Sequence, residues 1–355
     1  MASDTPTFGV YVHIPFCAKR CDYCAFATWT DRMHLVDAYL DACTADVDRA
    51  VGNGMPEATS VFFGGGTPSL VPADALMRVL EHIPLARGAE VTVECNPDTV
   101  DLALLRAYRG GGVNRLSFGV QSMVPHVLAS LGRTHDPANV TSSVDAARDA
   151  GFESFNVDLI YGAAGEALSD WTTTVALALA LDPPHVSAYG LTVEPGTPLA
   201  DEPERHPDDD DQADKYLVAD RLLADAGLAS YEISNWAKPG FECRHNLLYW
   251  SQGEYLGIGC AAHSHRDGVR WWNVRTPERY VDAITANRSP IAASERLDEA
   301  ERRIEALQLA LRTRDGVPTG ALPEELEDLV ERKGDRVVLT VRGRLLANEV
   351  ALRLS

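Results

Sequence analysis

Three cysteines lie within eight residues near the start of the chain. Cys17, Cys21 and Cys24, in the segment HIPFCAKRCDYCAF, have C-x3-C-x2-C spacing and follow a β-forming run from Phe8 to Ile14. Thiolates this close on one loop can each bind one iron of a four-iron cluster, and the fourth iron then stays open to a small molecule. A structural zinc ion would need a fourth ligand nearby, and none is present. The spacing therefore predicts a [4Fe-4S] cluster with one open iron.

Short β-branched runs alternate with amphipathic helical stretches over the first half of the chain. This alternation predicts βα units around a parallel sheet, and we expect an α/β fold with a partial (β/α)6 TIM-like barrel. A full eight-stranded barrel is the alternative, but the segment after Gly190 becomes irregular, and the acidic run from Asp208 to Asp211 then begins a helix. The six predicted strands are Phe8–Ile14, Ser60–Phe63, Glu90–Glu94, Arg115–Gly119, Ser154–Ile160 and His185–Leu191.

The C-terminal part has a different pattern. Apolar residues recur at helical spacing from Leu297 to Leu311, and a second helix is predicted from Leu322 to Val330. A strand from Arg336 to Val341 and a last helix after Gly343 follow. We expect a core domain over residues 1–280, which includes the HNLLYW segment, and a winged-helix-like α+β domain over residues 281–355 that packs on the core or covers its substrate.

Composition excludes several classes of protein. The 355 residues carry 52 acidic and 32 basic side chains, a formal charge of −20, which argues against nucleic acid as a partner because phosphate contacts need an excess of Lys and Arg. The apolar stretches are far shorter than the roughly 20 residues that cross a bilayer, so we do not expect an integral membrane protein. Seven cysteines, an odd number, and a start without a basic and apolar leader predict a reducing cytoplasm.

Polar residues and a glycine-rich turn follow the predicted strands. The second strand ends in GGGTP, where missing side chains let backbone amides approach a ligand, and the third ends at Glu94. Gln121 and Asp158 follow the fourth and fifth strands, and Arg133 stands in LGRTHD. Because loops at the carboxyl ends of barrel strands form the active face, we expect these side chains to bind the ammonium, ribose and carboxylate groups of one ligand beside the cysteines.

These segments together resemble the radical SAM superfamily, and within it the oxygen-independent coproporphyrinogen III oxidase-like branch. The resemblance runs from YVHIPFC through GGGTPS, GVQS, LGR and DLIYG to GRLLANEVALRL, nearly the whole chain. It implies that the open iron binds S-adenosylmethionine (SAM), and that an electron donor serves the cluster, whose electron splits SAM to a deoxyadenosyl radical. The positions that match the family's SAM pocket are Tyr11, Gly65, Gly66, Thr67, Glu94, Gln121, Arg133 and Asp158.

Two functions occur in this branch, and two local features separate them. One is coproporphyrinogen dehydrogenation, in which the radical begins the oxidative decarboxylation of propionates. The other is a heme chaperone, which binds heme and delivers it to acceptors such as respiratory proteins at the membrane. The dehydrogenase pattern carries a fourth cysteine two residues after the third, where this chain has Phe26. The segment HNLLYW is similar to the H-N-x-x-Y-W signature of the heme chaperones. We therefore expect a heme chaperone, with the dehydrogenase as the alternative and enzyme activity doubtful.

The resemblance implies that His245, Asn246, Tyr249 and Trp250 bind heme. If the segment is helical, His245 and Tyr249 share one face, so an imidazole and aromatic rings could meet a porphyrin. Cys243 is a competing axial ligand. A helix whose aromatic residues only pack on the barrel is the alternative without a heme. Cys260 and His263 also have C-x2-H spacing, but no second ligand pair completes a zinc site, and we expect them to pack at a strand end.

Overall fold

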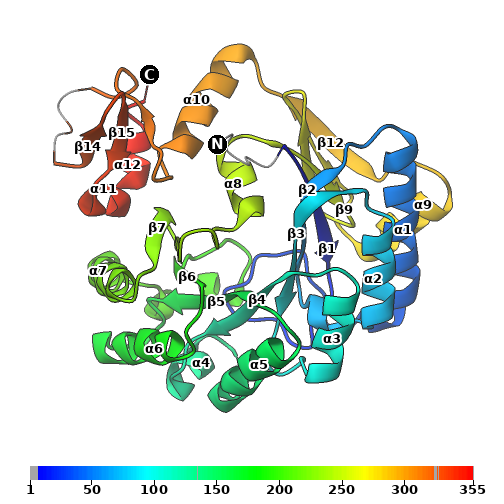
Figure 1. Ribbon diagram of the computed structural model, residues 1–355, viewed down its shortest axis with the longest axis horizontal. Coiled ribbons are helices and arrows are strands. Elements are labelled where there is room, and N and C mark those ends of the chain that lie inside the picture. The colour runs from blue at the N-terminus through cyan, green and yellow to red at the C-terminus, as the bar shows by residue number, and fades with distance from the viewer. Residues whose placement is uncertain (1–6, 134, 324–325, 327, 355) are drawn as a thin grey trace.

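The computed structural model describes residues 7–133, 135–323, 326 and 328–354. Six parallel strands form its centre, and all six were predicted from the sequence. Each brings apolar side chains into one core, as the fully buried Val10, Val61 and Val157 illustrate. The partial barrel is thereby confirmed (Figure 1). Its strands are β1 (Phe8–Ile14), β2 (Ala58–Gly65), β3 (Leu85–Cys95), β4 (Arg115–Gln121), β5 (Ser154–Tyr161) and β6 (His185–Gly190).

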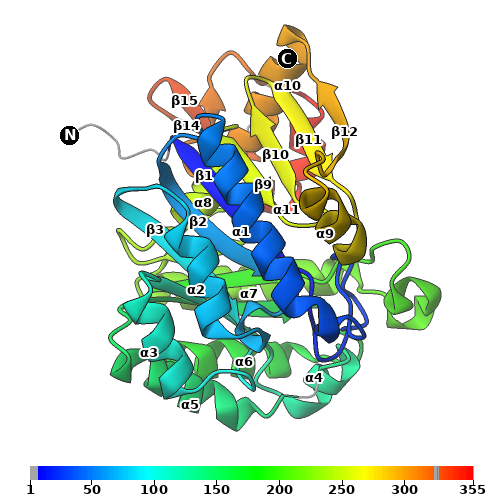
Figure 2. The same cartoon turned by 90° about the vertical axis from the view of Figure 1, so that its right-hand side faces the viewer.

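Helices cover the outer face of these strands, and Figure 2 shows α1 and α2 along the outside of β1 and β2. The helix α7 begins where the acidic run predicted it, because the Asp208 side chain caps it by accepting from the Asp211 amide. No described helix has the length and apolar composition needed to cross a bilayer. The α-helices here are α1 (Val36–Gly52), α2 (Ala73–Glu81), α3 (Leu102–Gly110), α4 (Pro125–Ser130), α5 (Pro137–Asp149), α6 (Leu168–Ala180) and α7 (Asp209–Asp225). Short 3-10 helices are η1 (Met33–Leu35), η2 (Pro68–Leu70), η3 (Pro198–Asp201) and η4 (Pro203–Arg205).

Strands that the sequence did not predict extend both edges of the sheet. One edge gains β9 (Glu254–Ile258), parallel to β1, and then the antiparallel β10 (His263–Arg266), β11 (Val269–Asn273) and β12 (Ile291–Arg296). The other gains β8 (Asn235–Ala237) and β7 (Ala229–Glu232). The strand order is β12-β11-β10-β9-β1-β2-β3-β4-β5-β6-β8-β7. Since this order has two ends, the described strands do not close an eight-stranded barrel.

The last third of the chain adds helices and a small sheet. The segment HNLLYW lies in α8 (Arg244–Trp250), which packs against β1, β2 and α10 (Glu299–Ala310). A three-stranded sheet in the order β13-β15-β14 has its own apolar cluster. The remaining elements are α9 (Pro277–Thr285), β13 (Val317–Pro318), β14 (Val330–Lys333), β15 (Arg336–Leu339), α11 (Val341–Leu345) and α12 (Ala347–Ala351).

Two expectations for the C-terminal part have different outcomes. The helix predicted from Leu322 to Val330 falls partly outside the described residues, and Val330 itself begins β14. The strand predicted from Arg336 is present as β15. The domain boundary near residue 280 stays a prediction, and β12 still pairs within the large sheet beyond it.

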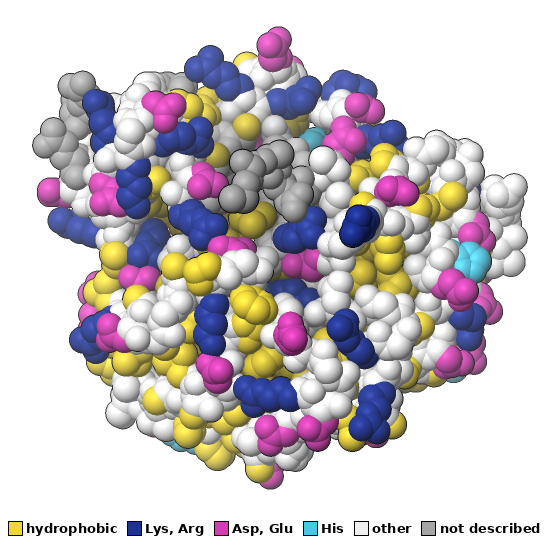
Figure 3. All heavy atoms as spheres, in the orientation of Figure 1, with side chains coloured by type: hydrophobic (Ala, Val, Ile, Leu, Met, Phe, Trp, Pro, Cys, Tyr) yellow, Lys and Arg dark blue, Asp and Glu magenta, His cyan; other side chains and the backbone are white. Residues whose placement is uncertain are grey.

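On the face in Figure 3, acidic and basic side chains are interspersed.

Candidate functional site

The cysteine loop folds back on itself directly after β1. The Cys17 amide donates to the Trp29 carbonyl at 3.1 Å, and the Trp29 amide donates to the Pro15 carbonyl at 2.8 Å. All seven cysteines of the chain are free thiols, and burial raises the pKa of Cys17 and Cys24. Among the described residues, no three His, Cys, Asp or Glu side chains converge on the position of one ion. Thiolates that each bind a separate iron need not converge on one point, so the arrangement of the loop is compatible with a cluster.

A cavity of about 720 Å³, here called the cluster cavity, opens beside this loop. It is lined by the loop cysteines and by the carboxyl ends of β2 to β5, where the barrel fold puts its active face. Seven of the eight residues expected to bind SAM come together in this cavity. These are Gly65, Gly66, Thr67, Glu94, Gln121, Arg133 and Asp158.

Two partly buried carboxyl groups, Glu94 and Asp158, line the cluster cavity. The Gly65 amide donates to Oε2 of Glu94 at 3.0 Å, and the hydroxyl of Ser117 donates to Asp158 at 2.8 Å. Burial raises the pKa of Glu94 to about 8, and the neighbouring charge of Asp158 adds to the rise. Burial also raises the pKa of Asp158. A cationic ligand group between these carboxyls would favour their charged forms.

Arg133 and Gln121 also line this cavity. Nη2 of Arg133 donates to the Gly119 carbonyl at 2.6 Å, and Nη1 lies 3.6 Å from Sγ of Cys21. Gln121 has a φ of 64° at a register shift between β4 and β5. This left-handed conformation is uncommon for a residue other than glycine, and such residues cluster at ligand sites.

The glycine-rich turn has a different role from the one expected. The Gly66 amide donates to the Ile14 carbonyl at 2.7 Å, and the Thr67 amide donates to the Phe16 carbonyl at 2.8 Å. A Cβ on Gly66 would lie 2.6 Å from the Phe16 carbonyl oxygen. The glycine is therefore required for close packing against the start of the cysteine loop, and these amides are not open to a ligand.

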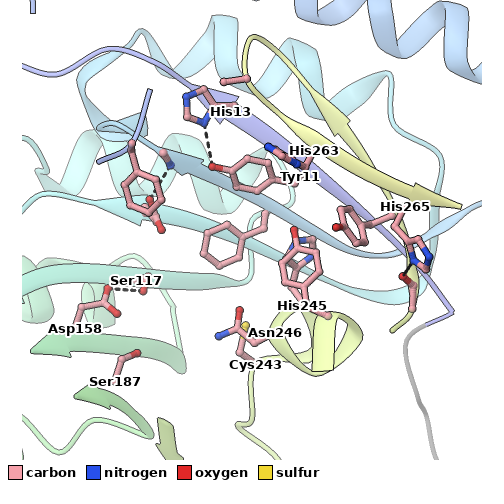
Figure 4. Close-up of a pocket in the computed structure, with 18 of the residues that line it drawn as sticks. Tyr11, His13, Ser117, Asp158, Ser187, Cys243, His245, Asn246, His263 and His265 are labelled. Atoms are coloured by element: carbon pink, nitrogen blue, oxygen red, sulfur yellow. Dashed lines mark hydrogen bonds between the residues drawn. The ribbon is translucent and has the colours of Figure 1, made fainter. Parts of the chain in front are cut away.

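A second cavity, here called the barrel cavity, has a volume of about 810 Å³ and adjoins the first. Figure 4 shows it extending from Ser117, Asp158 and Ser187 at one end to His265 at the other. Tyr11, expected in the SAM pocket, lines the barrel cavity instead, with its hydroxyl 3.1 Å from Nδ1 of His13. The residues common to both cavities are Ala25, Phe26, Gly65, Glu94, Ser117, Asp158 and Tyr189.

The helix α8 presents part of the expected heme segment to the barrel cavity. His245, Asn246 and Tyr249 line it, whereas Trp250 lies outside its described lining. His245 is 1% exposed, its Nδ1 lies 2.9 Å from the Ser60 hydroxyl, and its Nε2 lies 2.9 Å from the Tyr249 hydroxyl. Burial lowers the pKa of His245 to about 3. The ring is therefore neutral, and both of its nitrogens already have partners.

Cys243, the competing thiol, precedes α8 and is also buried. Its Sγ donates to Glu90 at 3.6 Å, and the Glu90 carboxylate also accepts from the amides of Arg244 and His245 at 3.1 Å. Burial raises the pKa of Cys243 to about 12. The side chain is thus a protonated thiol that supports the start of α8, and the thiolate needed for iron is disfavoured.

Two residues that line the barrel cavity, and to which the sequence did not point, have buried side-chain nitrogens without a hydrogen-bond partner in the part of the chain that the structure describes. Nε2 of His265 and Nε of Arg115 are buried without a hydrogen-bond partner among the described residues. His265 is 6% exposed and Arg115 is 3% exposed. The only sequence signal was the H-S-H alternation, which puts His263 and His265 on one side of a strand. His263 is exposed and stacks on Trp272, and Cys260 is buried beside the Tyr39 hydroxyl.

The chain is similar to one superfamily model and to several proteins that share one name. The family model of the radical SAM superfamily matches residues 11–178. A protein named heme chaperone HemW from Mycobacterium tuberculosis (strain ATCC 25618 / H37Rv) is 40% identical over 368 residues, which cover 98% of this chain and 94% of that protein. Heme chaperone HemW of Bacillus subtilis (strain 168) is 35% identical, covering 96% of this chain and 97% of that protein. Heme chaperone HemW of Escherichia coli (strain K12) is 37% identical, covering 85% of this chain and 79% of that protein.

A solved structure has the same fold along almost the whole chain. It is coproporphyrinogen III oxidase (HemN) from Escherichia coli, described as a radical SAM enzyme. The TM-score is 0.85 with 23% sequence identity, and the match covers 98% of this chain and 89% of that one. At this identity the likeness concerns the fold and carries no conclusion about the substrate.

Proposed function

The chain belongs to the radical SAM superfamily and, within it, to the family of proteins named heme chaperone HemW, and on this premise we propose that it is a radical SAM-type heme chaperone. The observation that carries the proposal is the similarity to these relatives along nearly the full length of both chains. In this proposal the protein works in the cytoplasm, binds a [4Fe-4S] cluster, SAM and heme, and transfers heme to acceptor proteins, such as respiratory proteins at the membrane.

The cluster cavity is the proposed site of the cluster and SAM. Cys17, Cys21 and Cys24 would each hold one iron, and an external electron donor would reduce the cluster. A bound cluster supplies the electron that can split SAM. Glu94 would accept from the SAM ammonium, and Arg133, beside Sγ of Cys21, would pair with the SAM carboxylate.

The barrel cavity is the proposed heme site. Its volume lies in the range of about 300–1,000 Å³ that ligand pockets have, and aromatic rings such as Phe62, Tyr249 and Tyr255 line it. The guanidinium of Arg115 is near the charges of Glu90 and Asp158, its Nε has no hydrogen-bond partner among the described residues, and a heme propionate would add a further carboxylate to this cation. Asn246, His245 and Tyr249 would contact the porphyrin from α8, while Trp250 would act through the packing of the helix.

Phe26 supports the chaperone over coproporphyrinogen dehydrogenation. It stands where the dehydrogenase pattern has a fourth cysteine, and a phenyl ring has no thiol chemistry. Its side chain is 62% exposed at the boundary of the two cavities. The dehydrogenase would use the same cluster and SAM site, so these sites alone do not discriminate between the two functions.

One pair of reactions tests the proposal. Anaerobically reconstituted protein is given coproporphyrinogen III with SAM and a reductant, and in parallel the heme-loaded protein is given a heme-free acceptor. We expect heme transfer in the second reaction, faster than from free heme, and no decarboxylated product in the first. Decarboxylation without transfer would replace the chaperone by the dehydrogenase.

A further inference from the structure

The barrel cavity is lined by five histidines among the described residues, and they differ in how their ring nitrogens are used. In His13, His185 and His245, both ring nitrogens lie 2.7–3.1 Å from hydrogen-bonding protein atoms. His263 is exposed, and its ring is stacked on Trp272, with a centroid distance of 5.6 Å and an interplanar angle of 24°. Of these five, only His265 combines burial with a ring nitrogen, Nε2, that has no hydrogen-bond partner among the described residues.

The hydrogen bond at the other nitrogen of His265 defines its tautomer. Nδ1 lies 2.9 Å from the Gly253 carbonyl oxygen. A carbonyl can only accept, so Nδ1 carries the hydrogen and donates it, and the neutral ring has its lone pair on Nε2. Metal-binding histidines typically donate their second N–H to a carbonyl or carboxylate, which orients the ring toward the metal. His265 thus has the hydrogen bond at its second nitrogen that a metal-binding histidine has, and its Nε2 is a buried nitrogen without a hydrogen-bond partner among the described residues.

The surroundings of Nε2 select a porphyrin-bound iron over a bare ion. A bare transition-metal ion needs several protein ligands, and no three suitable side chains converge in the part of the chain that the structure describes. A porphyrin brings four nitrogens of its own, so one imidazole completes a proximal site. The cavity around His265 is large and aromatic, with the Tyr255 ring centroid 6.1 Å from that of the imidazole.

We propose that Nε2 of His265 is the protein ligand to the heme iron. The proposal rests on the heme-binding function proposed above and names the residue of that site that binds the metal. His245 and Cys243 are then supports of α8, because the nitrogens of the one are occupied and the thiol of the other is protonated and directed at Glu90. This leaves His245 next to the porphyrin without coordinating it.

The test is a titration of the full-length, cluster-loaded protein with ferric heme, followed by absorbance and electron paramagnetic resonance. In His265→Asn, the side-chain amide takes the place of Nδ1, so the donor to Gly253 is kept and the iron-binding nitrogen is lost. We expect the wild type to show imidazole-ligated heme. The Asn variant should lose that signature, shift the Soret band and bind heme at least tenfold more weakly, with an unchanged unfolding temperature. His34→Asn, at an exposed histidine on η1, is the matched control and should behave as the wild type.

A second variant separates ligation from a structural role. His265→Gly should regain the imidazole signature when free imidazole is added, since the small ligand can occupy the vacated volume. If the Asn variant does not fold, this measurement still tests whether His265 binds the iron. A wild-type signature in His265→Asn, or its loss in His245→Gln or His263→Asn with His265 intact, would overturn the proposal. If the wild type binds no heme at all, the proposed function itself fails, and the two failures are therefore distinguishable.

Discussion

Glu94→Gln should stabilise the ligand-free protein at alkaline pH. The folded protein holds Glu94 with a pKa of about 8, against a usual value of 4.5, because burial and the charge of Asp158 disfavour the carboxylate. When folding raises the pKa of a carboxyl group, its contribution to the free energy of unfolding is fully present below the pKa of the group in the unfolded chain. The contribution is lost as the pH rises through the pKa of the group in the folded protein. Glutamine stays neutral and keeps an oxygen that can accept from the Gly65 amide, so the variant lacks this loss.

The size of the effect follows from the two pKa values. Between pH 6 and pH 9 the protonated fraction of Glu94 falls from nearly one to roughly one tenth in the folded state, while the unfolded chain is ionised throughout. Integration over this window gives the expected change: between pH 6 and pH 9, the free energy of unfolding of the wild type should fall by about 2.5 kcal/mol relative to that of Glu94→Gln.

Urea unfolding of both proteins at pH 6, 7, 8 and 9 measures this difference. Because the variant has every other titrating group of the wild type, the difference between their free energies of unfolding isolates the contribution of Glu94. We expect the wild type to fall progressively below the variant as the pH rises. A difference in the free energy of unfolding that stays constant within about 0.5 kcal/mol over this range would refute the inference that folding raises the pKa of Glu94.

Three further outcomes are expected. Replacing any one of the three loop cysteines by Ser should abolish the four-iron absorbance band, whereas Cys43→Ala, at a buried site on α1, should keep it; a full cluster in the loop variants would contradict the ligand assignment. Arg133→Ala should weaken SAM binding by about 1.5–3 kcal/mol in calorimetry without loss of iron, and parental affinity would place the SAM carboxylate elsewhere. Gly66→Ala should lower the free energy of unfolding by about 1–3 kcal/mol and reduce iron loading, because its Cβ meets two backbone carbonyls within 2.8 Å.

The central strands could be predicted because each is a short apolar run followed by a turn. The edge strands could not, since β10 has the sequence HSHR and β12 has IAASER, and neither carries the apolar alternation that marks a strand. Their pairing depends on neighbours that the chain brings together only after folding. The alternative of a closed barrel is wrong because β9 pairs with β1 whereas β8 pairs with β6, so the strands after β6 extend the two edges of the sheet and do not join them.

The candidate site divides in a similar way. The polar residues at strand ends were predictable, because a parallel barrel brings these ends together, and the cluster cavity contains seven of the eight expected residues. The hydrogen-bond state of a histidine was not predictable. His245 is bonded to Ser60, 185 residues away in the sequence, and the free nitrogen of His265 is apparent only from the buried atoms around it. The motif thus indicated the segment proposed to contact heme, but not which imidazole has a nitrogen without a partner among the described residues.

The two cavities share part of their wall. Glu94 and Asp158 line both, so a charged group bound in either cavity would change the protonation of carboxyls that the other cavity shares. Linkage is reciprocal, so a ligand in one cavity would change the affinity of the other cavity by the same factor in both directions. The proton content of this shared pair would then depend on which cavity is occupied.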